Sequence, residues 1–147
     1  MVVAGGLEAN LVDADDHVIA ILDRNPATVG HVLIVTRAHR RDIEDLRPDE
    51  AGSAMRVARR VAKAQRDGLE AVGVNLRQNN GARAGQDVFH FHMHVIPRYE
   101  DDTVLTGCVW GVDPWKPPRN SAVDRRDVAR AIVSHCQTPE TTTARSW

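Results

Sequence analysis

Three histidines alternate with apolar residues in the segment 90–94, His-Phe-His-Met-His. In an extended strand successive side chains point to opposite faces, so His90, His92 and His94 are predicted to share one face. The opposite face would be apolar and contain Phe89, Phe91, Met93 and Val95. Three adjacent imidazoles are poor packing residues, because each has a donor and an acceptor to satisfy and their charged forms repel one another. The pattern therefore predicts a functional site on the histidine face.

Two kinds of chemistry use such a row of imidazoles. Alternating histidines can bind zinc through ring nitrogens, with a remote ligand or water completing a tetrahedron. They can also act as nucleophile and proton carriers in a reaction at phosphorus. The segment 79–86, Asn-Asn-Gly-Ala-Arg-Ala-Gly-Gln, lies just upstream and offers glycine backbone N–H groups and amide side chains to an anion. Its position favours a phosphate ligand.

The strands that must position these residues follow from hydrophobic patterning. Aliphatic runs bounded by turn residues predict five strands, at 9–13, 18–22, 31–36, 72–76 and 88–97. The first of these is the weakest pattern, and the last is the strongest and carries the histidines.

Two helices are predicted between and after the strands. Arg47-Pro48-Asp49-Glu50 suits a helix start, because Pro fits the first helical position and early carboxylates suit the positive end of the dipole. This helix should run over about 48–67 and end at Gly68. Its core face is predicted to contain Ala51, Ala54, Met55, Ala58, Val61, Ala62 and Gln65. A second helix is expected at 121–136, opening in a capping box. Outside these elements we expect an irregular segment at 100–120 and a disordered tail at 137–147.

Length and composition limit the class of protein. A chain of 147 residues with 42% hydrophobic content suits a single domain over 1–147, with its core at about 9–98. The net charge of −1 provides no basic field for duplex nucleic acid, and the apolar runs are too short to span a membrane. Residues 1–10 show no secretory signal pattern, and Cys108 and Cys136 have no motif spacing. We therefore expect a cytoplasmic protein.

The residues around the histidines resemble the histidine triad family. That family's motif alternates three histidines with hydrophobic residues and adds two more hydrophobic residues, as in segment 90–96, His-Phe-His-Met-His-Val-Ile. The resemblance continues upstream through Asn79, Gly81 and Gly85-Gln86, and through Asp-Arg-Asn-Pro at 23–26 and Gly-His-Val-Leu-Ile-Val at 30–35. It implies an α+β fold with an antiparallel sheet of about five strands and two main helices. It also implies a homodimer that forms a continuous sheet.

The same resemblance implies roles for individual residues. His92 would be the nucleophile that forms a transient nucleotidyl-histidine, while His90 and His31 would form a hydrogen-bonded relay that orients it. His94 would contact the phosphate near the leaving group, and Asp23 would bind the ribose hydroxyls. The α-phosphate would be held by the remaining family positions, Asn79, Gln86 and the backbone of Gly85 to Asp87. Neutral imidazole, with an ordinary pKa of about 6.5, is a competent nucleophile at pH 7.

Two departures from the family pattern affect these expectations. Many relatives have a hydroxyl residue at the position of Asp87, whereas a carboxylate there repels phosphate unless it points away or is protonated. Some bacterial relatives use paired N-terminal cysteines in a structural zinc site, but this chain has no cysteine before Cys108. His39 alone cannot rebuild that site. We therefore expect no metal and no cofactor.

The predicted function is nucleotidyl hydrolysis at the α-phosphate of a substrate that contains AMP. Segments 46–50 and 95–98 resemble the branch that cleaves dinucleoside polyphosphates, whereas Asn79 is typical of the branch that cleaves AMP-amine phosphoramidates. The leaving group therefore stays open at this point. The alternatives are a nucleotidyl transferase or phosphorylase, a non-catalytic nucleotide sensor and, least favoured, a zinc-dependent enzyme. The expected partners are a purine nucleotide such as AMP and a second copy of the chain.

Overall fold

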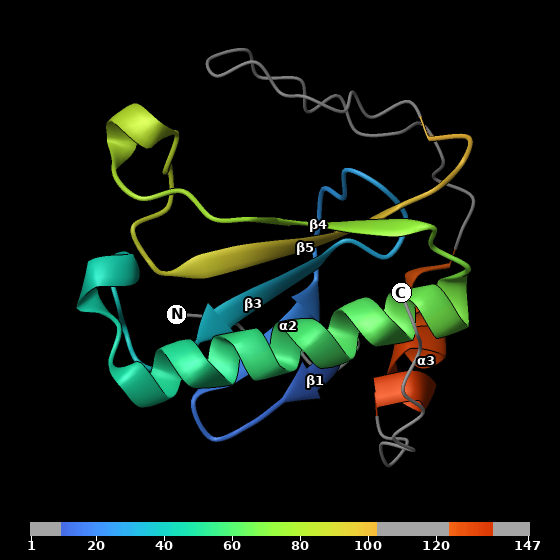
Figure 1. The fold of residues 1–147 in the computed structure, drawn as a ribbon, viewed down its shortest axis with the longest axis horizontal. Helices are drawn as coiled ribbons and strands as arrows, with labels where there is room; N and C mark the ends of the chain where they lie inside the picture. The colour runs from blue at the N-terminus through green and yellow to red at the C-terminus, as the bar shows by residue number, and fades with distance from the viewer. Residues whose placement is uncertain (1–9, 103–123, 137–147) are drawn as a thin grey trace, which may run out of the picture.

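A five-stranded antiparallel sheet forms the centre of the protein. The structure is a computed structural model and describes residues 10–102 and 124–136 (Figure 1). Within these ranges the strands are β1 (Leu11–Ala14), β2 (Val18–Leu22), β3 (Val32–Thr36), β4 (Gly73–Arg77) and β5 (His92–Arg98). Their spatial order is β1-β2-β3-β5-β4, and every neighbouring pair is antiparallel. The α+β fold predicted from the sequence is confirmed.

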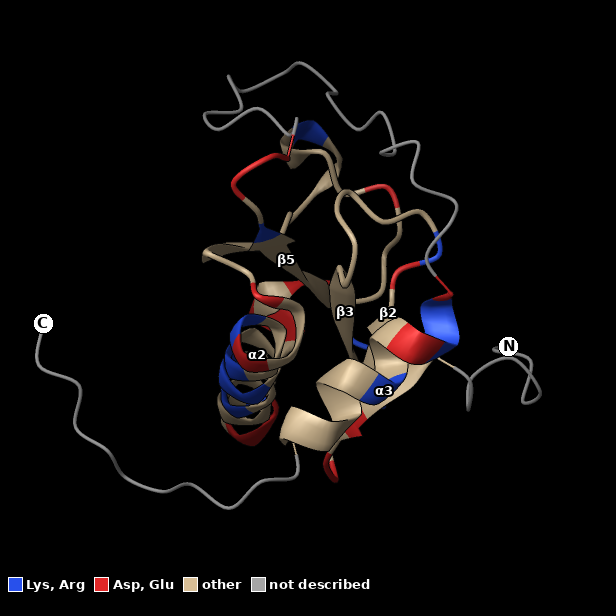
Figure 2. Ribbon diagram, turned by 90° about the vertical axis from the view of Figure 1, so that its right-hand side faces the viewer, with Lys and Arg blue, Asp and Glu red and all other residues tan. Residues whose placement is uncertain are grey.

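The two long helices lie on one face of this sheet (Figure 2). Helix α2 (Pro48–Leu69) packs against β1, β2, β3 and β5, and α3 (Arg125–Cys136) packs against α2 and β1. Two short 3-10 helices, η1 (Ile43–Asp45) and η2 (Ala82–Ala84), lie in the connections. No helix within residues 10–102 and 124–136 has the length and apolar character needed to span a membrane. Residues 121–123 of the predicted capping box, residues 103–120 of the predicted irregular segment 100–120, and the predicted tail 137–147 fall outside the described residues.

Alternation along the central strands separates a core face from a second face. Val32 and Ile34 of β3 are fully buried on the helix side, where Val57 and Val61 of α2 pack in the same core. Burying each such side chain contributes about 1.5–3 kcal/mol. The intervening residues on the opposite face are only half-buried, and in β2 and β3 they are Ile19, Ile21, Leu33 and Val35. The two long helices therefore cover only one face of the sheet, and the half-buried side chains lie on the other face.

The predicted start of α2 is confirmed, whereas its predicted end is wrong. Glu50 is buried and accepts hydrogen bonds from the backbone N–H of Arg47 (2.8 Å) and from Nε of Arg40 (2.8 Å). The helix passes through Gly68 and ends before Glu70, which is left-handed with φ 59°. Gly68 serves the packing of the two helices instead, because a Cβ there would lie 2.7 Å from the carbonyl oxygen of Ala131 in α3.

The histidine strand begins later than the sequence pattern predicted. Strand β5 starts at His92, because the preceding residues form loop contacts: Gln86 Nε2 donates to the carbonyl of Val88, and the N–H of Phe91 donates to the carbonyl of Arg40 (2.6 Å). Phe89 is 43% exposed, so its predicted place in the core is wrong. The other apolar members of the pattern, Phe91, Met93 and Val95, are buried as predicted.

Candidate active site

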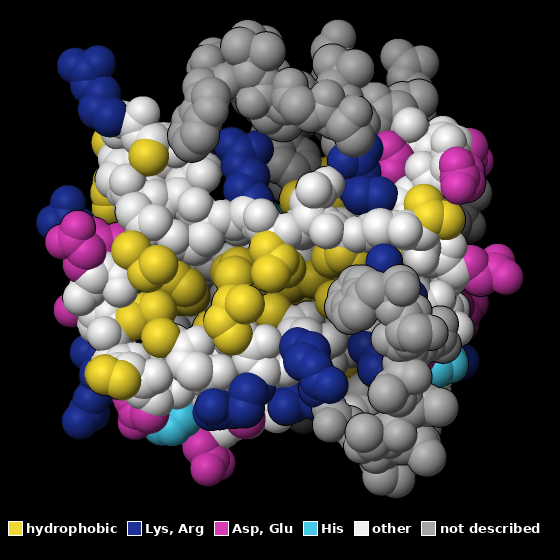
Figure 3. Space-filling model, viewed as in Figure 1, with side chains coloured by type: hydrophobic (Ala, Val, Ile, Leu, Met, Phe, Trp, Pro, Cys, Tyr) yellow, Lys and Arg dark blue, Asp and Glu magenta, His cyan; other side chains and the backbone are white. Residues whose placement is uncertain are grey.

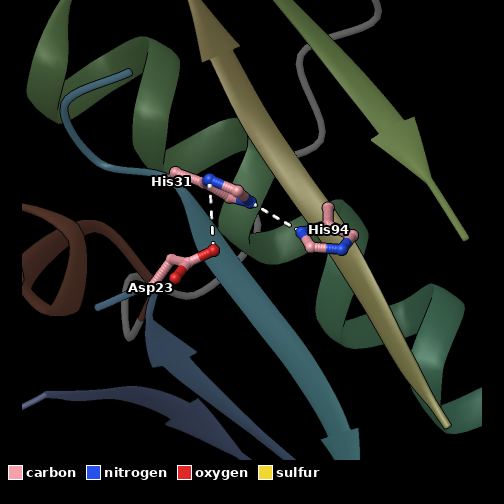
Figure 4. Close-up of side chains that lie close together, drawn as sticks. All are labelled: Asp23, His31 and His94. Atoms are coloured by element: carbon pink, nitrogen blue, oxygen red, sulfur yellow. Dashed lines mark hydrogen bonds and ion pairs between the residues drawn. The ribbon is translucent and has the colours of Figure 1, made fainter. Parts of the chain in front are cut away.

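His31 and His94 form a hydrogen-bonded pair at the end of β3 nearest the ribose candidate Asp23 (Figure 4). Their atoms Nε2 and Nδ1 are 2.9 Å apart. The backbone N–H of Ala27 donates to Nδ1 of His31 at 3.1 Å, whereas Oδ2 of Asp23 lies farther from that nitrogen, at 3.4 Å. An amide N–H can only donate, so the proton of neutral His31 is on Nε2 and is donated to His94. The proton of neutral His94 is consequently on Nε2.

Burial keeps both members of this pair uncharged near neutral pH. His31 is 2% exposed, and burial lowers its pKa to about 4. Burial is also the main reason that the pKa of His94 falls to about 4; repulsion by the protonated forms of His31 and His92 and by Arg77 adds to the effect, and the carboxylate of Asp23 opposes it. Two neutral imidazoles can therefore hold the tautomers just described.

His92 has the opposite tautomer. Its Nδ1 is 2.7 Å from the carbonyl oxygen of His90, and a carbonyl can only accept, so Nδ1 carries the proton. In the neutral ring Nε2 then holds the lone pair, and it has no hydrogen-bond partner among the described residues. The ring centroids of His92 and His94 are 5.3 Å apart. The backbone carbonyl of His90 thus sets the tautomer of His92, whose Nε2 lone pair lies beside the neutral ring of His94.

The predicted relay between His90 and His31 is wrong. His90 lies before β5, and its Nε2 is 2.8 Å from the carbonyl oxygen of Thr36. Its ring meets that of His39 edge-on with centroids 5.1 Å apart. His31 bonds to His94 instead. The chain bends at His90, so the simple strand alternation fails there. The described contact of His90 with His92 is made by the backbone carbonyl of His90.

The Gly-rich loop after β4 lies beside the histidines. Continuing the β4–β5 register from the Arg77–His94 pair by two residues would place Asn79 opposite His92. Gly81 and Gly85 have φ of +86° and +84°, a conformation that L side chains rarely adopt. The loop is therefore shaped by glycine at the two positions that the sequence pattern singled out.

The amide side chains of this loop hold the loop itself. Gln86 is buried; its Oε1 accepts from the N–H of Gly81 (2.7 Å), and its Nε2 donates to the carbonyls of Arg41 (2.7 Å) and Val88 (3.1 Å). Nδ2 of Asn79 donates to the carbonyl of Gly85 (3.1 Å). The described hydrogen bonds of both amide groups are therefore made within the loop and to Arg41 rather than to an anion.

The two carboxylates proposed for the site differ in environment. Asp23 follows β2, is half-buried and accepts a hydrogen bond from the N–H of Asn25 (2.9 Å). Asp87 is exposed and accepts from the N–H of Val88 (2.9 Å). The structure thus brings Asp23 next to the His31–His94 pair and keeps the carboxylate of Asp87 at the surface.

Asp23, His31 and His94 also form a group whose composition suits a metal, with one ligand atom from each lying within 4.8 Å of the others. Two nitrogens bound to one tetrahedral zinc lie about 3.4 Å apart, whereas Nε2 of His31 and Nδ1 of His94 are 2.9 Å apart and share a proton. Coordination through Nδ1 of His31 would instead remove the acceptor of the buried Ala27 N–H. In this arrangement His31 and His94 are hydrogen-bonded to each other, and Asp23 lies 3.4 Å from Nδ1 of His31.

Gln65 supports the pair from the opposite side of the sheet and was not recognised as a site residue from the sequence. It is fully buried on α2, and its Nε2 donates to the carbonyls of Gly30 (2.8 Å) and Val95 (3.1 Å), which neighbour His31 and His94. Extending the β3–β5 register would place Gly30 opposite Pro97, which has no N–H to donate. Gln65 supplies the missing donor. A polar residue within the apolar helix face was its only sequence signal.

Comparisons with known proteins show the family of the chain. The HIT domain family matches residues 5–101 of the chain. The chain belongs to the histidine triad family. It is 37% identical over 118 residues to the Protein hit of Bacillus subtilis, a match covering 79% of this chain and 81% of that protein. Histidine triad proteins bind nucleotides, and the family includes nucleotide hydrolases and transferases.

Solved structures of histidine triad proteins share the fold. A zinc-bound family protein from Mycobacterium smegmatis superposes with a TM-score of 0.69 at 31% identity, covering 86% of this chain and 82% of that one. A hypothetical histidine triad nucleotide-binding protein from Sulfolobus tokodaii gives a TM-score of 0.69 at 26% identity, covering 86% and 83%. The described fold is therefore that of the histidine triad family.

Proposed function

We propose that the protein is a nucleotidyl hydrolase that cleaves an AMP-containing substrate at its α-phosphate, with His92 as the nucleophile. The observation that carries this proposal is the pair of opposite tautomers on β5. The carbonyl of His90 fixes the proton of His92 on Nδ1, and His31 fixes the proton of His94 on Nε2. A lone pair and an N–H donor are thereby offered side by side, as attack on a phosphate requires.

The reaction proceeds in two displacements at phosphorus. In the first, Nε2 of His92 forms a bond to the α-phosphorus while the bond from phosphorus to the leaving group breaks, and the electron pair departs with that group. The imidazolium charge is stabilised by the hydrogen bond from Nδ1–H to the carbonyl of His90. In the second, water attacks the phosphorus, the N–P electron pair returns to His92, a proton passes to solvent and AMP is released. The Nε2–H of His94 donates to a phosphate oxygen.

An apolar strip on the same face of the sheet suits the nucleoside. The registers place Leu33 opposite His94 and Val35 opposite His92, so these side chains share the face of the two histidines. Ile21 and Ile19 continue the same two rows on β2. All four are half-buried and can pack against a planar base. Asp23, at the end of β2, then lies where ribose hydroxyls can donate to its carboxylate.

The α-phosphate is assigned to the glycine-shaped loop. The expectation that all backbone N–H groups from Gly85 to Asp87 bind its oxygens is corrected, because those of Gly85 and Gln86 donate to the carbonyls of Ala82 (3.0 Å) and Gly81 (3.1 Å). The backbone N–H of Asp87 is the remaining donor proposed for a phosphate oxygen, while the side chains of Gln86 and Asn79 hold the loop in shape. The exposed carboxylate of Asp87 is the feature that favours the second candidate function, a nucleotide sensor that binds without turnover, because a fixed negative charge opposes an approaching phosphate.

A substrate panel with product identification tests the proposed function. The panel contains diadenosine triphosphate and tetraphosphate, AMP-amine phosphoramidates and a nucleotide sugar, each with and without added inorganic phosphate. We expect AMP as a product of at least one substrate, with one leaving group released per AMP. ADP formed only when phosphate is added would identify a phosphorylase instead. Tight AMP binding without turnover of any substrate would support the sensor and contradict hydrolysis.

We further propose that the protein is a homodimer joined through α2 and β4. Apolar side chains form a band between these two elements (Figure 3), and they line a groove to which Arg59 also contributes. Its apolar members are Met55, Ala58, Ala62, Val74 and Leu76. Met55 was predicted to lie in the core but is 55% exposed, and Leu76 is 47% exposed. Strand β4 is an edge of the described sheet and pairs there with β5 alone. A second copy would cover the groove and extend the sheet.

The dimer predicts a sedimentation mass of about twice 16.2 kDa at micromolar concentration. Leu76→Lys should shift the protein to the monomer, because a lysine ammonium would be desolvated in the interface. Leu11→Lys, which changes an exposed leucine on the other edge strand, is the matched control and should stay dimeric. A wild-type protein that sediments as a monomer at these concentrations would contradict the proposed assembly.

A further inference from the structure

Arg77 places a permanent positive charge beside the proposed reaction centre. It is the last residue of β4 and lies directly opposite His94 in the antiparallel β4–β5 ladder. Directly opposite residues of such a pair project to the same face, so Arg77 is on the face that carries His92 and His94. An isolated arginine at the end of a strand matches no sequence motif, so the sequence alone indicates no role for Arg77.

Contacts at the end of β4 hold this arginine toward the phosphate loop. Its side chain is half-buried, and its Nε lies 3.5 Å from Oδ1 of Asn79, whose Nδ2 donates to the carbonyl of Gly85. The guanidinium is also close enough to His94 for its charge to contribute to the lowered pKa of that histidine. Arg77 thus contacts Asn79 in the loop assigned to the α-phosphate and is also near His94.

We propose that Arg77 binds a phosphate of the leaving group, and that the site therefore prefers substrates in which AMP is joined to further phosphate over AMP-amine phosphoramidates. This inference rests on the proposed function and specifies its substrate class. A guanidinium is charged at all relevant pH values and pairs with two phosphate oxygens at once. A substrate with an uncharged amine leaving group offers no anion at this position.

The proton balance of the first displacement favours the same substrates. When the leaving group is a nucleoside polyphosphate, the P–O electron pair departs on a stable oxyanion, whose charge Arg77 offsets and which needs no proton. An amine leaving group must instead gain a proton as the P–N bond breaks. His94 is neutral at pH 7, since its pKa is about 4, and so carries no additional proton for an amine. The described site therefore assists phosphate departure more than amine departure.

The test compares two substrates on the same enzyme samples. Diadenosine tetraphosphate and AMP morpholidate are assayed with the wild type, Arg77→Gln, Arg77→Lys and the control Arg66→Gln, which removes an exposed arginine of α2. We expect Arg77→Gln to lower kcat/KM for diadenosine tetraphosphate by about 10- to 100-fold and to change that for AMP morpholidate by less than about threefold. Arg77→Lys should restore part of the loss, and Arg66→Gln should match the wild type.

Taking the ratio of the two kcat/KM values removes any effect of a reduced folded fraction. An unchanged ratio in Arg77→Gln, or a wild type that prefers AMP morpholidate, would overturn the role of Arg77. His92→Asn is assayed alongside on both substrates. If it abolishes turnover of both while Arg77→Gln leaves the ratio unchanged, the proposed function stands and this inference alone fails. If His92→Asn retains turnover, the proposed function itself fails.

Discussion

Replacing His92 with asparagine is expected to reduce turnover by about three to five orders of magnitude while changing AMP affinity by less than about threefold. Asparagine can keep a donor toward the carbonyl of His90, but it offers no nitrogen lone pair to phosphorus. The proposed ribose and base contacts are made by Asp23 and by the apolar side chains of β2 and β3 rather than by His92, so we expect AMP affinity to change little. Steady-state kinetics and AMP titration by calorimetry measure the two effects separately.

Two other histidines serve as comparisons in that experiment. His94→Asn should be milder, because it removes a donor to the phosphate but spares the attacking nitrogen. His17→Asn alters a histidine in the turn before β2 and should behave as the wild type. Equal losses in His17→Asn and His92→Asn would show that the assay reports general damage rather than nucleophilic catalysis.

Acidification is expected to destabilise the fold well before the carboxylates titrate. His31 and His94 have pKa values of about 4 in the folded protein, against about 6.5 in an unfolded chain. Between these values the unfolded state binds more protons, so the free energy of unfolding rises with pH and falls as pH is lowered. The stabilisation is fully present above about pH 6.5, and each imidazole removes up to about 1.4 kcal/mol per pH unit on the way toward pH 4.

Urea unfolding at intervals between pH 7 and pH 5 measures this slope. Carboxylates such as Asp15 do not titrate between pH 7 and pH 5, because the pKa of Asp15 in the folded protein lies below its ordinary value of 3.8. His94→Asn should unfold with a shallower pH dependence than the wild type, because one of the two buried titrating rings is gone. A free energy of unfolding that stays constant or increases as pH falls from 7 to 5 would contradict the buried neutral pair.

Much of the fold follows from local patterns in the sequence. The predicted strand at 18–22 matches β2, and the proline and carboxylates after Arg47 correctly mark the start of α2. The boundaries fail where tertiary contacts override the pattern. Residues 88–91 alternate like a strand, but the Gln86 amide and the Arg40 carbonyl take up their backbone groups. Gly68 looks like a helix end, but the close approach of α3 explains its small size.

The residue types of the candidate site could be predicted from the sequence, but the contacts between side chains on different strands could not. Alternation on one strand correctly placed His92 and His94 together, because both lie within β5. The bond between His31 and His94 joins residues 63 positions apart, and it depends on the register of β3 against β5, which periodicity does not specify. For the same reason the sequence did not reveal that Arg77 faces His94. Which side chains face each other across two strands can be predicted only when the register of the strands is known.

The most direct test of the account is to trap and map the covalent intermediate. The wild-type protein is mixed with substrate labelled in the AMP moiety, quenched without acid and digested for mass spectrometry. We expect one AMP adduct on His92, labile in acid and stable in base as a phosphoramidate should be, and its absence from His92→Asn. An adduct on any other residue, or undiminished turnover in His92→Asn, would contradict the assignment of His92 as the nucleophile.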